Sequence, residues 1–278
     1  MKLSAVSDFK VLVVGDAIID EYRYATPIGK SVKDNIISVR FDGMVEEFQG
    51  GVWAAANHIR DFCQQVHVLH GNRITRNVRY VEEVYNSKLF TVHSYLDRNE
   101  EQDGIDVSHY DVVIVTDFGH GTMTDDLIEL VTREARFLAV NTQTNSTNFG
   151  FNLITRYPRA DYVVLDELEA RLAAHDRASD IEDVILKLQY PKIIVTQGAN
   201  GATGFDGEFY RERAIARKVV DTIGAGDAFL AVSSPFAAAG ASIKELVTIG
   251  NAAGAIKVGI VGHRKYVTKA EMEDYLGN

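Results

Sequence analysis

The chain has 278 residues, of which 46% are hydrophobic and 24% are charged. These are ordinary values for a globular protein, and they exclude a disordered, collagen-like or coiled-coil chain. The 39 acidic residues outnumber the 29 basic ones and give a net charge of -10, so bulk electrostatics favour neither a nucleic-acid nor an anionic-membrane partner.

Along the chain, short apolar strands alternate with helical segments. Apolar runs rich in β-branched residues predict buried strands at 10–15, 111–116, 137–141, 162–165 and 192–196. Helical spacing of apolar residues predicts helices over 123–136 and 181–189, and three Ala-rich helices over 225–239, 242–258 and 268–276. This order is typical of a parallel sheet covered by helices.

Two segments, residues 20–49 and 77–95, break this pattern. They alternate polar with aromatic or β-branched residues and contain turn sequences at Asp42-Gly43 and Asn86-Ser87. We expect them to form the antiparallel strands of a small accessory sheet, folded as a lid over one end of the main sheet. A lid that excludes water suits a phosphoryl transferase, but an edge extension or a dimer contact would give the same pattern.

The sharpest chemical signal is the sequence DTIGAGDAF at residues 221–229, at the start of the helix predicted from Ala225. Glycines let the backbone approach a ligand closely, and the free N–H groups at a helix start bind anions. Asp227 could take the proton of a substrate hydroxyl while those N–H groups stabilise charge on a transferred phosphoryl group. An ordinary helix start has the same composition, so this motif alone does not decide the function.

Together with other motifs, this segment resembles the PfkB/ribokinase family of carbohydrate kinases, whose signature is D-T-x-G-A-G-D. Gly50-Gly51 resembles the family's N-terminal diglycine, VTQGANG at 195–201 its nucleotide loop, and NAAG at 251–254 the helix that borders the adenine pocket. The opening VLVVGDAIIDEY and TDFGHG at 116–121 look most like the heptose-phosphate kinase branch, the kinase half of bacterial ADP-heptose synthases.

This resemblance extends over residues 8–276 and implies a fold. We expect a single kinase domain over residues 1–278 with a ribokinase-like three-layer α/β/α architecture, a mainly parallel central sheet and a small β lid inserted at about 20–49 and 77–95.

The resemblance also implies a role for each matching position. Asp227 would be the catalytic base, and Gly224, Ala225 and Gly226 would form the anion hole. The acceptor would be bound by Asp16, Asp20, Gly50, Gly51, Asn57 and Asp117, and ATP by Thr196, Gly198, Gly201, Asn251 and Gly254. Glu169 would hold Mg²⁺ through water together with Asp166, which stands where the family has Asn. A monovalent cation is the further cofactor that the resemblance suggests.

Several departures from the family pattern lie on the acceptor side. Ala54, beside Trp53, replaces a sugar-binding Asn, and His120 replaces a permanent cation by a group that titrates near neutrality. The family's D-P-K is Asn141-Thr142-Gln143 here, and the segment after His70 is shorter by about a helix and a strand. Asp227 and its glycines remain, so the changes concern the choice of acceptor.

The sequence therefore predicts an ATP-dependent kinase for a hydroxyl of a sugar or sugar phosphate, and the resemblance suggests the anomeric hydroxyl of a heptose 7-phosphate. Two alternatives stay open. The first is a catalytically weak or inactive nucleotide- or sugar-binding protein. The second is a kinase for a nucleoside or another modified sugar, with Trp53 as a stacking face.

Cysteine use and the N-terminus bear on location. Cys63 is the single cysteine, residues 1–10 lack an apolar signal core, and no apolar stretch is long enough to cross a bilayer. We expect a cytoplasmic protein whose partners are a small-molecule acceptor and, through the lid, a second copy of the chain.

Overall fold

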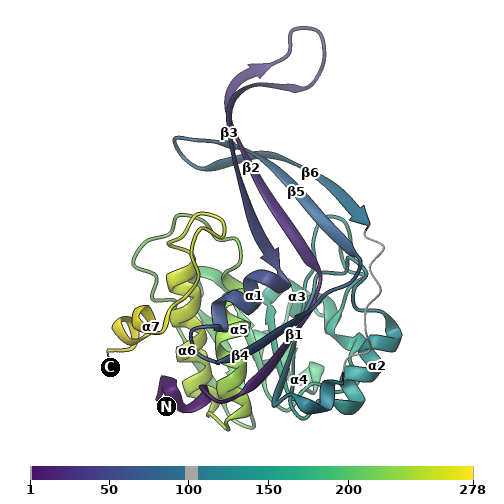
Figure 1. The fold of residues 1–278 in the computed structure, drawn as a ribbon, viewed down its shortest axis with the longest axis vertical. Helices are drawn as coiled ribbons and strands as arrows, with labels where there is room; N and C mark the ends of the chain where they lie inside the picture. Colours follow the sequence, from purple (N-terminus) through teal and green to yellow (C-terminus); the bar gives the residue numbers. More distant parts are fainter. Residues whose placement is uncertain (1, 98–105, 278) are drawn as a thin grey trace.

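The computed structural model describes residues 2–97 and 106–277 and contains two sheets of different size (Figure 1). The larger sheet has the strand order β12-β11-β10-β9-β8-β7-β1-β4. Its strands are β1 (Lys10–Gly15), β4 (Gln65–Leu69), β7 (Val112–Asp117), β8 (Leu138–Thr142), β9 (Tyr162–Asp166), β10 (Ile193–Thr196), β11 (Ala202–Phe205) and β12 (Phe209–Glu212). Neighbours from β4 to β10 are parallel, and β11 is antiparallel to both of its neighbours, so the mainly parallel sheet is confirmed.

Helices cover both faces of this sheet because its central strands are apolar on both sides. Val11 and Val13 of β1 join the core under α1 (Val52–Ile59), α5 (Ala225–Ala238) and α6 (Ile243–Lys257). Leu12 and Val14 join the core under α2 (Asp125–Glu134), α3 (Glu167–Ala173) and α4 (Ile181–Leu188). This alternation follows from the two-residue period of a strand. The three-layer α/β/α architecture is therefore confirmed.

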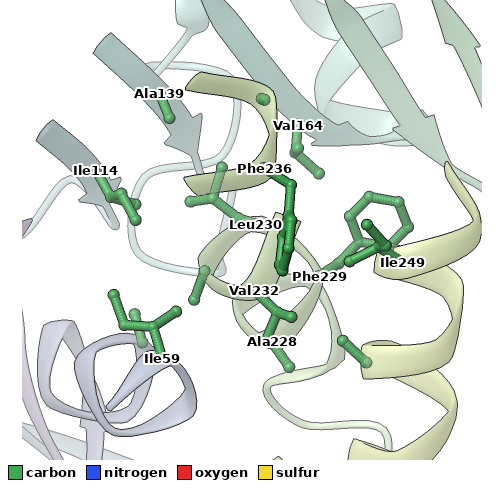
Figure 2. Close-up of a cluster of buried hydrophobic side chains, with 14 of the residues drawn as sticks. Ile59, Ile114, Ala139, Val164, Ala228, Phe229, Leu230, Val232, Phe236 and Ile249 are labelled. Carbon is green, nitrogen blue, oxygen red and sulfur yellow. The ribbon is translucent and has the colours of Figure 1, made fainter. Parts of the chain in front are cut away.

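Helix α5 lies at the centre of the first core. Figure 2 shows its side chains Leu230 and Phe236 among residues of β7, β9, α1 and α6. Helix α7 (Lys269–Leu276) packs against α6. Short 3₁₀ turns are η1 (Leu3–Val6), η2 (Val107–His109), η3 (Ile154–Arg156) and η4 (Gly198–Asn200). Within residues 2–97 and 106–277, no helix combines the length and the apolar character needed to span a membrane.

The smaller sheet is the lid, and it rises from one end of the main sheet (Figure 1). Its strands are β2 (Ala17–Lys30), β3 (Ile37–Gly51), β5 (Arg73–Glu82) and β6 (Ser87–Asp97), in the order β3-β2-β5-β6. The two hairpins are antiparallel within themselves, but β2 and β5 pair in parallel. The expectation of purely antiparallel strands was wrong, because β2 and β5 continue from the parallel neighbours β1 and β4 and leave the sheet in the same direction.

One predicted lid turn is misplaced. The β2–β3 hairpin turns at residues 31–36, and Asp42-Gly43 lies inside β3. There the pairing shifts register between Arg23 and Ala25 of β2, and Gly43 has a φ of 86°. The Asp-Gly sequence therefore forms a bulge, which needs the same left-handed backbone as a hairpin turn. The other predicted turn is present: Asn86 has a φ of 52° between β5 and β6.

The parallel strands all point the same way, and this gathers the polar sequence motifs at one edge of the sheet. Asp16 follows β1, and Asp117, Asp166 and Thr196 are the last residues of β7, β9 and β10. In open α/β sheets the carboxyl ends of the strands form the usual ligand site. Here that edge lies below the lid (Figure 1).

Candidate active site

The site is organised around residues 221–227, which we call the glycine turn and which lead into α5. Gly224 is the N-cap of α5 and has a φ of 76°, in the left-handed region. A Cβ at this position would lie 2.7 Å from Cε1 of His263 and 3.2 Å from Cε of Lys257, so glycine alone fits. The first N–H groups of a helix have no partner within it and carry partial positive charge. The glycine turn therefore presents an anion-binding helix start.

Two cavities meet at the glycine turn. The polar cavity has a volume of about 680 Å³, and Gly224 and Asp227 line it. The apolar cavity has a volume of about 430 Å³, and Ala225 and Gly226 line it. Four consecutive residues thus separate two binding spaces, so groups bound on either side would approach each other at this turn.

Asp227 is buried at the wall of the polar cavity. Nε2 of Gln143, which follows β8, donates a hydrogen bond of 2.6 Å to its Oδ1. Burial raises the pKa of Asp227 to about 6, against the opposing effects of the Gln143 hydrogen bond and the positive charge of Lys257. At neutral pH this carboxyl group is mainly ionised and more basic than an exposed aspartate. A pKa close to the working pH is what a general base requires.

Asp20 and Arg79 form an ion pair in the polar cavity and come from the lid strands β2 and β5. The carboxylate of Asp20 also accepts a hydrogen bond of 3.2 Å from Nδ2 of Asn77, and Nε2 of His263 lies 3.7 Å from its other oxygen. Arg79 is the one Lys or Arg among the described residues that line this cavity. Its positive charge is thus already matched by Asp20.

The two predicted diglycine residues support this wall. Gly51, with a φ of 57°, lines the polar cavity. Gly50 lies behind Asp20, because a Cβ at Gly50 would be 2.7 Å from Oδ2 of Asp20.

Two histidines of the polar cavity are held neutral by burial. Burial lowers the pKa of His263 to about 4, in spite of the nearby Asp20 carboxylate. Burial also lowers the pKa of His120, whose Nδ1 lies 2.8 Å from Oγ1 of Thr75. Both imidazoles can therefore donate or accept hydrogen bonds to a ligand near pH 7, but they bring no permanent charge.

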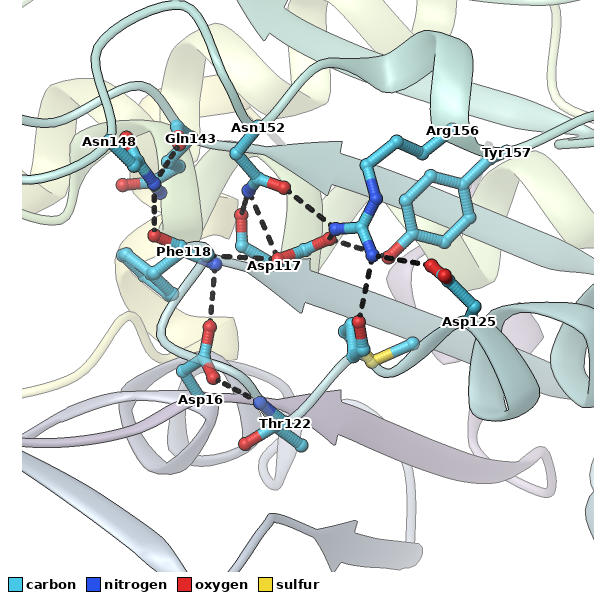
Figure 3. A network of polar contacts seen from close by, with 12 residues as sticks. Asp16, Asp117, Phe118, Thr122, Asp125, Gln143, Asn148, Asn152, Arg156 and Tyr157 are labelled. Carbon is cyan, nitrogen blue, oxygen red and sulfur yellow. Dashed lines mark hydrogen bonds and ion pairs between the residues drawn. The ribbon is translucent and has the colours of Figure 1, made fainter.

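Asp16 and Asp117, two of the predicted acceptor ligands, lie beneath the cavity and shape its wall. Asp16 accepts hydrogen bonds of 2.9 Å from the backbone N–H groups of both Phe118 and Thr122 (Figure 3). It also accepts one of 3.1 Å from the backbone N–H group of His120. Asp117 accepts from the hydroxyl of Tyr157 at 2.8 Å and from Nδ2 of Asn152 at 3.0 Å. Neither aspartate lines the polar cavity. Their carboxylates fold the loop that carries Phe118 and His120 to it.

Asn57 and Trp53 lie on α1 and line neither cavity. The Trp53 ring packs edge-on against His70, with 5.2 Å between ring centroids. Trp53 lines a separate hollow with Phe48 and Gln49 of β3, so the structure gives no support to the alternative in which this ring stacks on an acceptor.

All five residues predicted to bind ATP line the apolar cavity: Thr196, Gly198, Gly201, Asn251 and Gly254. Sequence reasoning missed the apolar side chains between them, which are Ala214, Ala216, Val219, Phe229, Ala255 and Val258. These are small or common residues that carry no motif. The cavity has apolar walls and the anion-binding turn at one end, which suits a planar base joined to phosphates.

Asp166 and Glu169 form the capping box of α3 beside the glycine turn. Glu169 accepts hydrogen bonds from the backbone N–H groups of Thr144 at 3.1 Å and Asp166 at 2.8 Å. Burial, followed by the negative charge of Asp166, raises the pKa of Glu169 to about 8. A bound cation would offset this effect and favour the ionised form of Glu169, and carboxylate oxygens are the ligands that Mg²⁺ takes.

Among the described residues, no group of three or more His, Cys, Asp or Glu could enclose a metal ion by itself. One or two carboxylates with water and substrate phosphates are the usual surroundings of Mg²⁺ at phosphoryl-transfer sites. Asp166 and Glu169 fit that pattern.

The lid is bound directly to the glycine turn. The Tyr22 hydroxyl and Lys88 Nζ donate hydrogen bonds to Asp221 at 2.9 Å and 2.7 Å, and Nδ2 of Asn86 donates to the carbonyl of Val220 at 3.3 Å. Burial opposes the ionisation of Asp221, but the Lys88 contact and two backbone N–H groups lower its pKa to about 2. These contacts couple both lid hairpins to the turn.

Sequence reasoning missed much of the polar cavity, which residues from distant segments line: Asn77, Thr91, His93, Asn145, Ser146 and His263. Arg79 is the exception, because the basic cluster of Arg73, Arg76 and Arg79 in the lid sequence already indicates either a solvated face or a contact with a sugar phosphate. Arg73 and Arg76 pair instead with Asp97 and with Glu21 and Glu47 outside the cavity.

The model of the pfkB family carbohydrate kinase matches residues 63–269. A protein named Bifunctional protein HldE from Hyphomonas neptunium is 31% identical over 159 residues, covering 54% of this chain and 32% of that protein. Its namesake from Nitratiruptor is 23% identical over 309 residues, covering 96% and 64%. The chain thus spans less than two thirds of the length of these relatives.

Solved structures match over nearly the full chain. A putative ribokinase from Agrobacterium tumefaciens has a TM-score of 0.72 at 17% identity and covers 98% of both chains. The ribokinase of Arabidopsis thaliana complexed with ribose and ATP has a TM-score of 0.72 at 15% identity, covering 98% of this chain and 100% of that one. At such identities the matches show the fold, and the ribokinase-like architecture expected from the sequence is confirmed.

Proposed function

Because this chain belongs to the pfkB family of carbohydrate kinases, we propose that it transfers the γ-phosphoryl group of ATP to a hydroxyl group of a sugar or sugar phosphate. One observation carries the proposal: the anion-binding glycine turn lies between the two cavities. Gly224 and Asp227 line the polar cavity, and Ala225 and Gly226 line the apolar one. A donor on one side and an acceptor on the other would meet there.

Under this proposal each part of the site has a task. The apolar cavity binds the nucleotide through Thr196, Gly198, Gly201, Asn251 and Gly254, and the N–H groups of the glycine turn bind the transferred phosphoryl oxygens. The Asp227 carboxylate takes the proton of the acceptor hydroxyl as the hydroxyl oxygen bonds to the γ-phosphorus, while the bond from that phosphorus to the bridging oxygen breaks and ADP leaves. Mg²⁺, held through water by Asp166 and Glu169, would neutralise charge on the ATP phosphates.

For the acceptor, the sequence resemblance favours a heptose 7-phosphate phosphorylated at its anomeric hydroxyl. The curated relatives support that branch by their shared name, Bifunctional protein HldE. The chain covers only part of their length, so the proposal concerns the kinase step alone. The lid and the main sheet would work as one kinase unit, since Asp20 and Arg79 come from the lid and Asp227 from α5.

A second candidate acceptor is an unphosphorylated sugar or a nucleoside. It is favoured by the charge of the polar cavity, where Arg79 is already paired with Asp20 and burial keeps His120 and His263 neutral. A phosphate group on the acceptor would find no unpaired guanidinium or ammonium among the described lining residues. Neutral hydroxyl groups, in contrast, can form hydrogen bonds with the amide, imidazole and carboxylate side chains that line the cavity.

A protein that only binds sugar or nucleotide is less well supported. Burying an ionisable carboxyl group raises its pKa and destabilises its ionised form. Asp227 is buried in this way, with a raised pKa, at the turn where the two cavities meet. A base for phosphoryl transfer explains that position, whereas simple binding does not require it.

We further propose that two copies of the chain associate through their lids in the cytoplasm. In each lid strand, alternate residues face opposite sides of the sheet. Thr91 and His93 of β6 line the polar cavity, so Phe90, Val92 and Leu96 face the other side, where all three are exposed. Exposed apolar groups of this kind mark interaction surfaces.

The test is ADP release from ATP and Mg²⁺ across a panel of sugars, heptose phosphates and nucleosides. Asp227→Asn should retain nucleotide binding, measured by a thermal shift with ATP, and should lose transfer by a factor on the order of 10²–10⁴. Asp126→Asn, an exposed change on α2, is the matched control and should behave like the wild type. Full turnover by the Asp227→Asn variant would exclude the assigned base.

The phosphorylated and unphosphorylated members of the panel separate the two acceptor candidates. Turnover with heptose phosphates alone supports the first, and turnover with nucleosides or free sugars supports the second. If no acceptor stimulates ADP release while ATP still binds, the kinase proposal fails and the binding-protein interpretation replaces it.

A further inference from the structure

A lysine is fully buried beneath the glycine turn. Lys257 is the last residue of α6, and its exposed fraction is 0%. Lysine is rarely buried to this degree, because removing an ammonium group from water is unfavourable unless the protein supplies other partners. Nζ of Lys257 donates hydrogen bonds to the backbone carbonyls of Ile223 at 2.6 Å and Gly262 at 2.8 Å.

These two carbonyls belong to two of the loops that line the polar cavity. Ile223 precedes Gly224, and Gly262 precedes His263, whose ring lies against Gly224 and near Asp20. One ammonium group therefore joins the glycine turn to the loop after α6. The contact is close, since a Cβ at Gly224 would lie 3.2 Å from Cε of Lys257.

Asp221 joins the same two residues from their other side. The backbone N–H groups of Gly262 and Ile223 donate to its carboxylate at 2.9 Å and 3.2 Å, while the carbonyls of these two residues accept from Lys257. Asp221 is ionised at neutral pH, because its pKa is about 2. In each of these two residues, the backbone N–H group is thus bound to the carboxylate of Asp221 and the backbone carbonyl to the ammonium group of Lys257.

The oxygen atoms around Nζ are of the kind that binds a monovalent cation. Converging backbone carbonyls replace the hydration shell of K⁺ in proteins, and the carboxylates of Asp221 and Asp227 supply negative charge nearby. An ammonium group is itself a monovalent cation and already occupies the space between these carbonyls. A second cation there would be repelled by the first. A free monovalent cation therefore does not fit at this place.

We propose that Lys257 is a positioning residue whose ammonium group takes the place of a free monovalent cation under the glycine turn, so that the protein works without one. The assignment of the turn as the phosphoryl anion hole rests on the proposed kinase function. The assignment of the cation rests on the contacts of Lys257 alone. The two can therefore be tested separately.

The first experiment uses the wild-type protein. Its thermal midpoint, and its turnover once an acceptor is found, are measured in KCl, NH₄Cl, NaCl and tetramethylammonium chloride at equal ionic strength. We expect both quantities to be the same in all four salts. A midpoint or a turnover number that rises with K⁺ or NH₄⁺ but not with tetramethylammonium would overturn the proposal, and this measurement depends on no variant.

The second experiment removes the tethered cation. In Lys257→Ala, a small cation can enter the vacated space, so we expect a lower thermal midpoint that K⁺ or NH₄⁺ partly restores and tetramethylammonium does not. In Lys257→Met, the apolar side chain fills the space, so no salt should restore the midpoint. Lys244→Met, an exposed change on the same helix, is the matched control and should match the wild type.

Turnover gives the second readout. We expect kcat of Lys257→Ala to fall on the order of 10²-fold without K⁺, with a smaller change in the KM for the acceptor, because the lysine touches the turn and not the ligand. Wild-type kcat in Lys257→Ala without K⁺ would overturn the proposal. If no acceptor is ever phosphorylated, a salt-independent wild type and a K⁺-responsive Lys257→Ala midpoint still support the tethered cation, and only the kinase function fails.

Discussion

At the scale of single residues, the reactivity of Asp227 is set by opposing neighbours. Burial raises its pKa to about 6, while the amide of Gln143 and the charge of Lys257 pull it down. In the sequence, Gln143 was noted only as a departure from the D-P-K pattern, with the loss of a charge. In the structure, its amide donates a hydrogen bond of 2.6 Å to Oδ1 of Asp227.

This environment predicts the pH dependence of transfer. A general base must be ionised, so kcat/KM should fall as the pH drops through about 6. The Gln143 hydrogen bond favours the ionised carboxyl group, so Gln143→Leu should move the midpoint to higher pH. Initial rates from pH 4.5 to 9 check this. A profile that is flat across pH 5–7, or a midpoint unchanged by Gln143→Leu, would contradict it.

The cavity residues that lie in short local motifs were predictable, and those brought together by contacts between distant segments were not. Thr196, Gly198 and Gly201 lie within one loop, and all three line the same cavity. Asp16 and Asp20 look equivalent in the sequence, but β2 begins at Ala17, and only Asp20 reaches the polar cavity. No local sequence pattern shows that backbone N–H groups of residues 118–122 donate hydrogen bonds to the carboxylate of Asp16.

At the level of elements, the contacts of Tyr22 and Lys88 with Asp221 connect the lid, whose residues line the polar cavity, to the glycine turn. Lys88, at the start of β6, donates to Asp221 Oδ1 at 2.7 Å. A hydrogen bond to a charged group contributes about 1.5–3 kcal/mol, and the partial exposure of Lys88 lowers this value.

Lys88→Met should therefore lower the free energy of unfolding by about 1 kcal/mol and raise the KM for the acceptor more than the KM for ATP. Urea unfolding and steady-state kinetics measure both quantities. Lys33→Met, at the exposed tip of the β2–β3 hairpin, is the control and should change neither. An unaltered acceptor KM in Lys88→Met would show that this contact does not control the lid.

Element boundaries were predictable where burial dictates the pattern. The main strands are apolar on both faces, and each predicted run lies within two residues of the observed strand. In the lid, Asp42-Gly43 has turn chemistry but forms a bulge, because the register of a long hairpin depends on its whole length. The parallel pairing of β2 with β5 follows from the neighbouring positions of β1 and β4, which the lid sequence does not contain.

At the scale of the whole molecule, the outer face of the lid carries the proposed dimer contact. Phe90, Val92 and Leu96 of β6 are 39%, 49% and 44% exposed. Tyr80 stacks on Phe90 with 4.5 Å between ring centroids and extends the apolar surface onto β5. This face lies on the side of the lid opposite the polar cavity.

Val92→Glu should convert a dimer into a monomer, because the buried carboxylate would have no partner across the interface. Sedimentation velocity of the wild type and the variant measures this. Leu186→Glu, which places the same charge on an exposed apolar position of α4, should leave the dimer intact. A wild-type protein that sediments as a monomer at tens of micromolar would refute the lid interface.

The residues that line the two cavities come mostly from different parts of the chain. The described residues that line the apolar cavity all lie between 166 and 258, whereas most of those that line the polar cavity lie between 18 and 146. Under the proposed function, mutations in the first half can therefore change the choice of acceptor while the nucleotide-binding residues of the second half stay the same. A lineage with this layout can then diversify its acceptors through ancestors that all keep the ability to bind ATP.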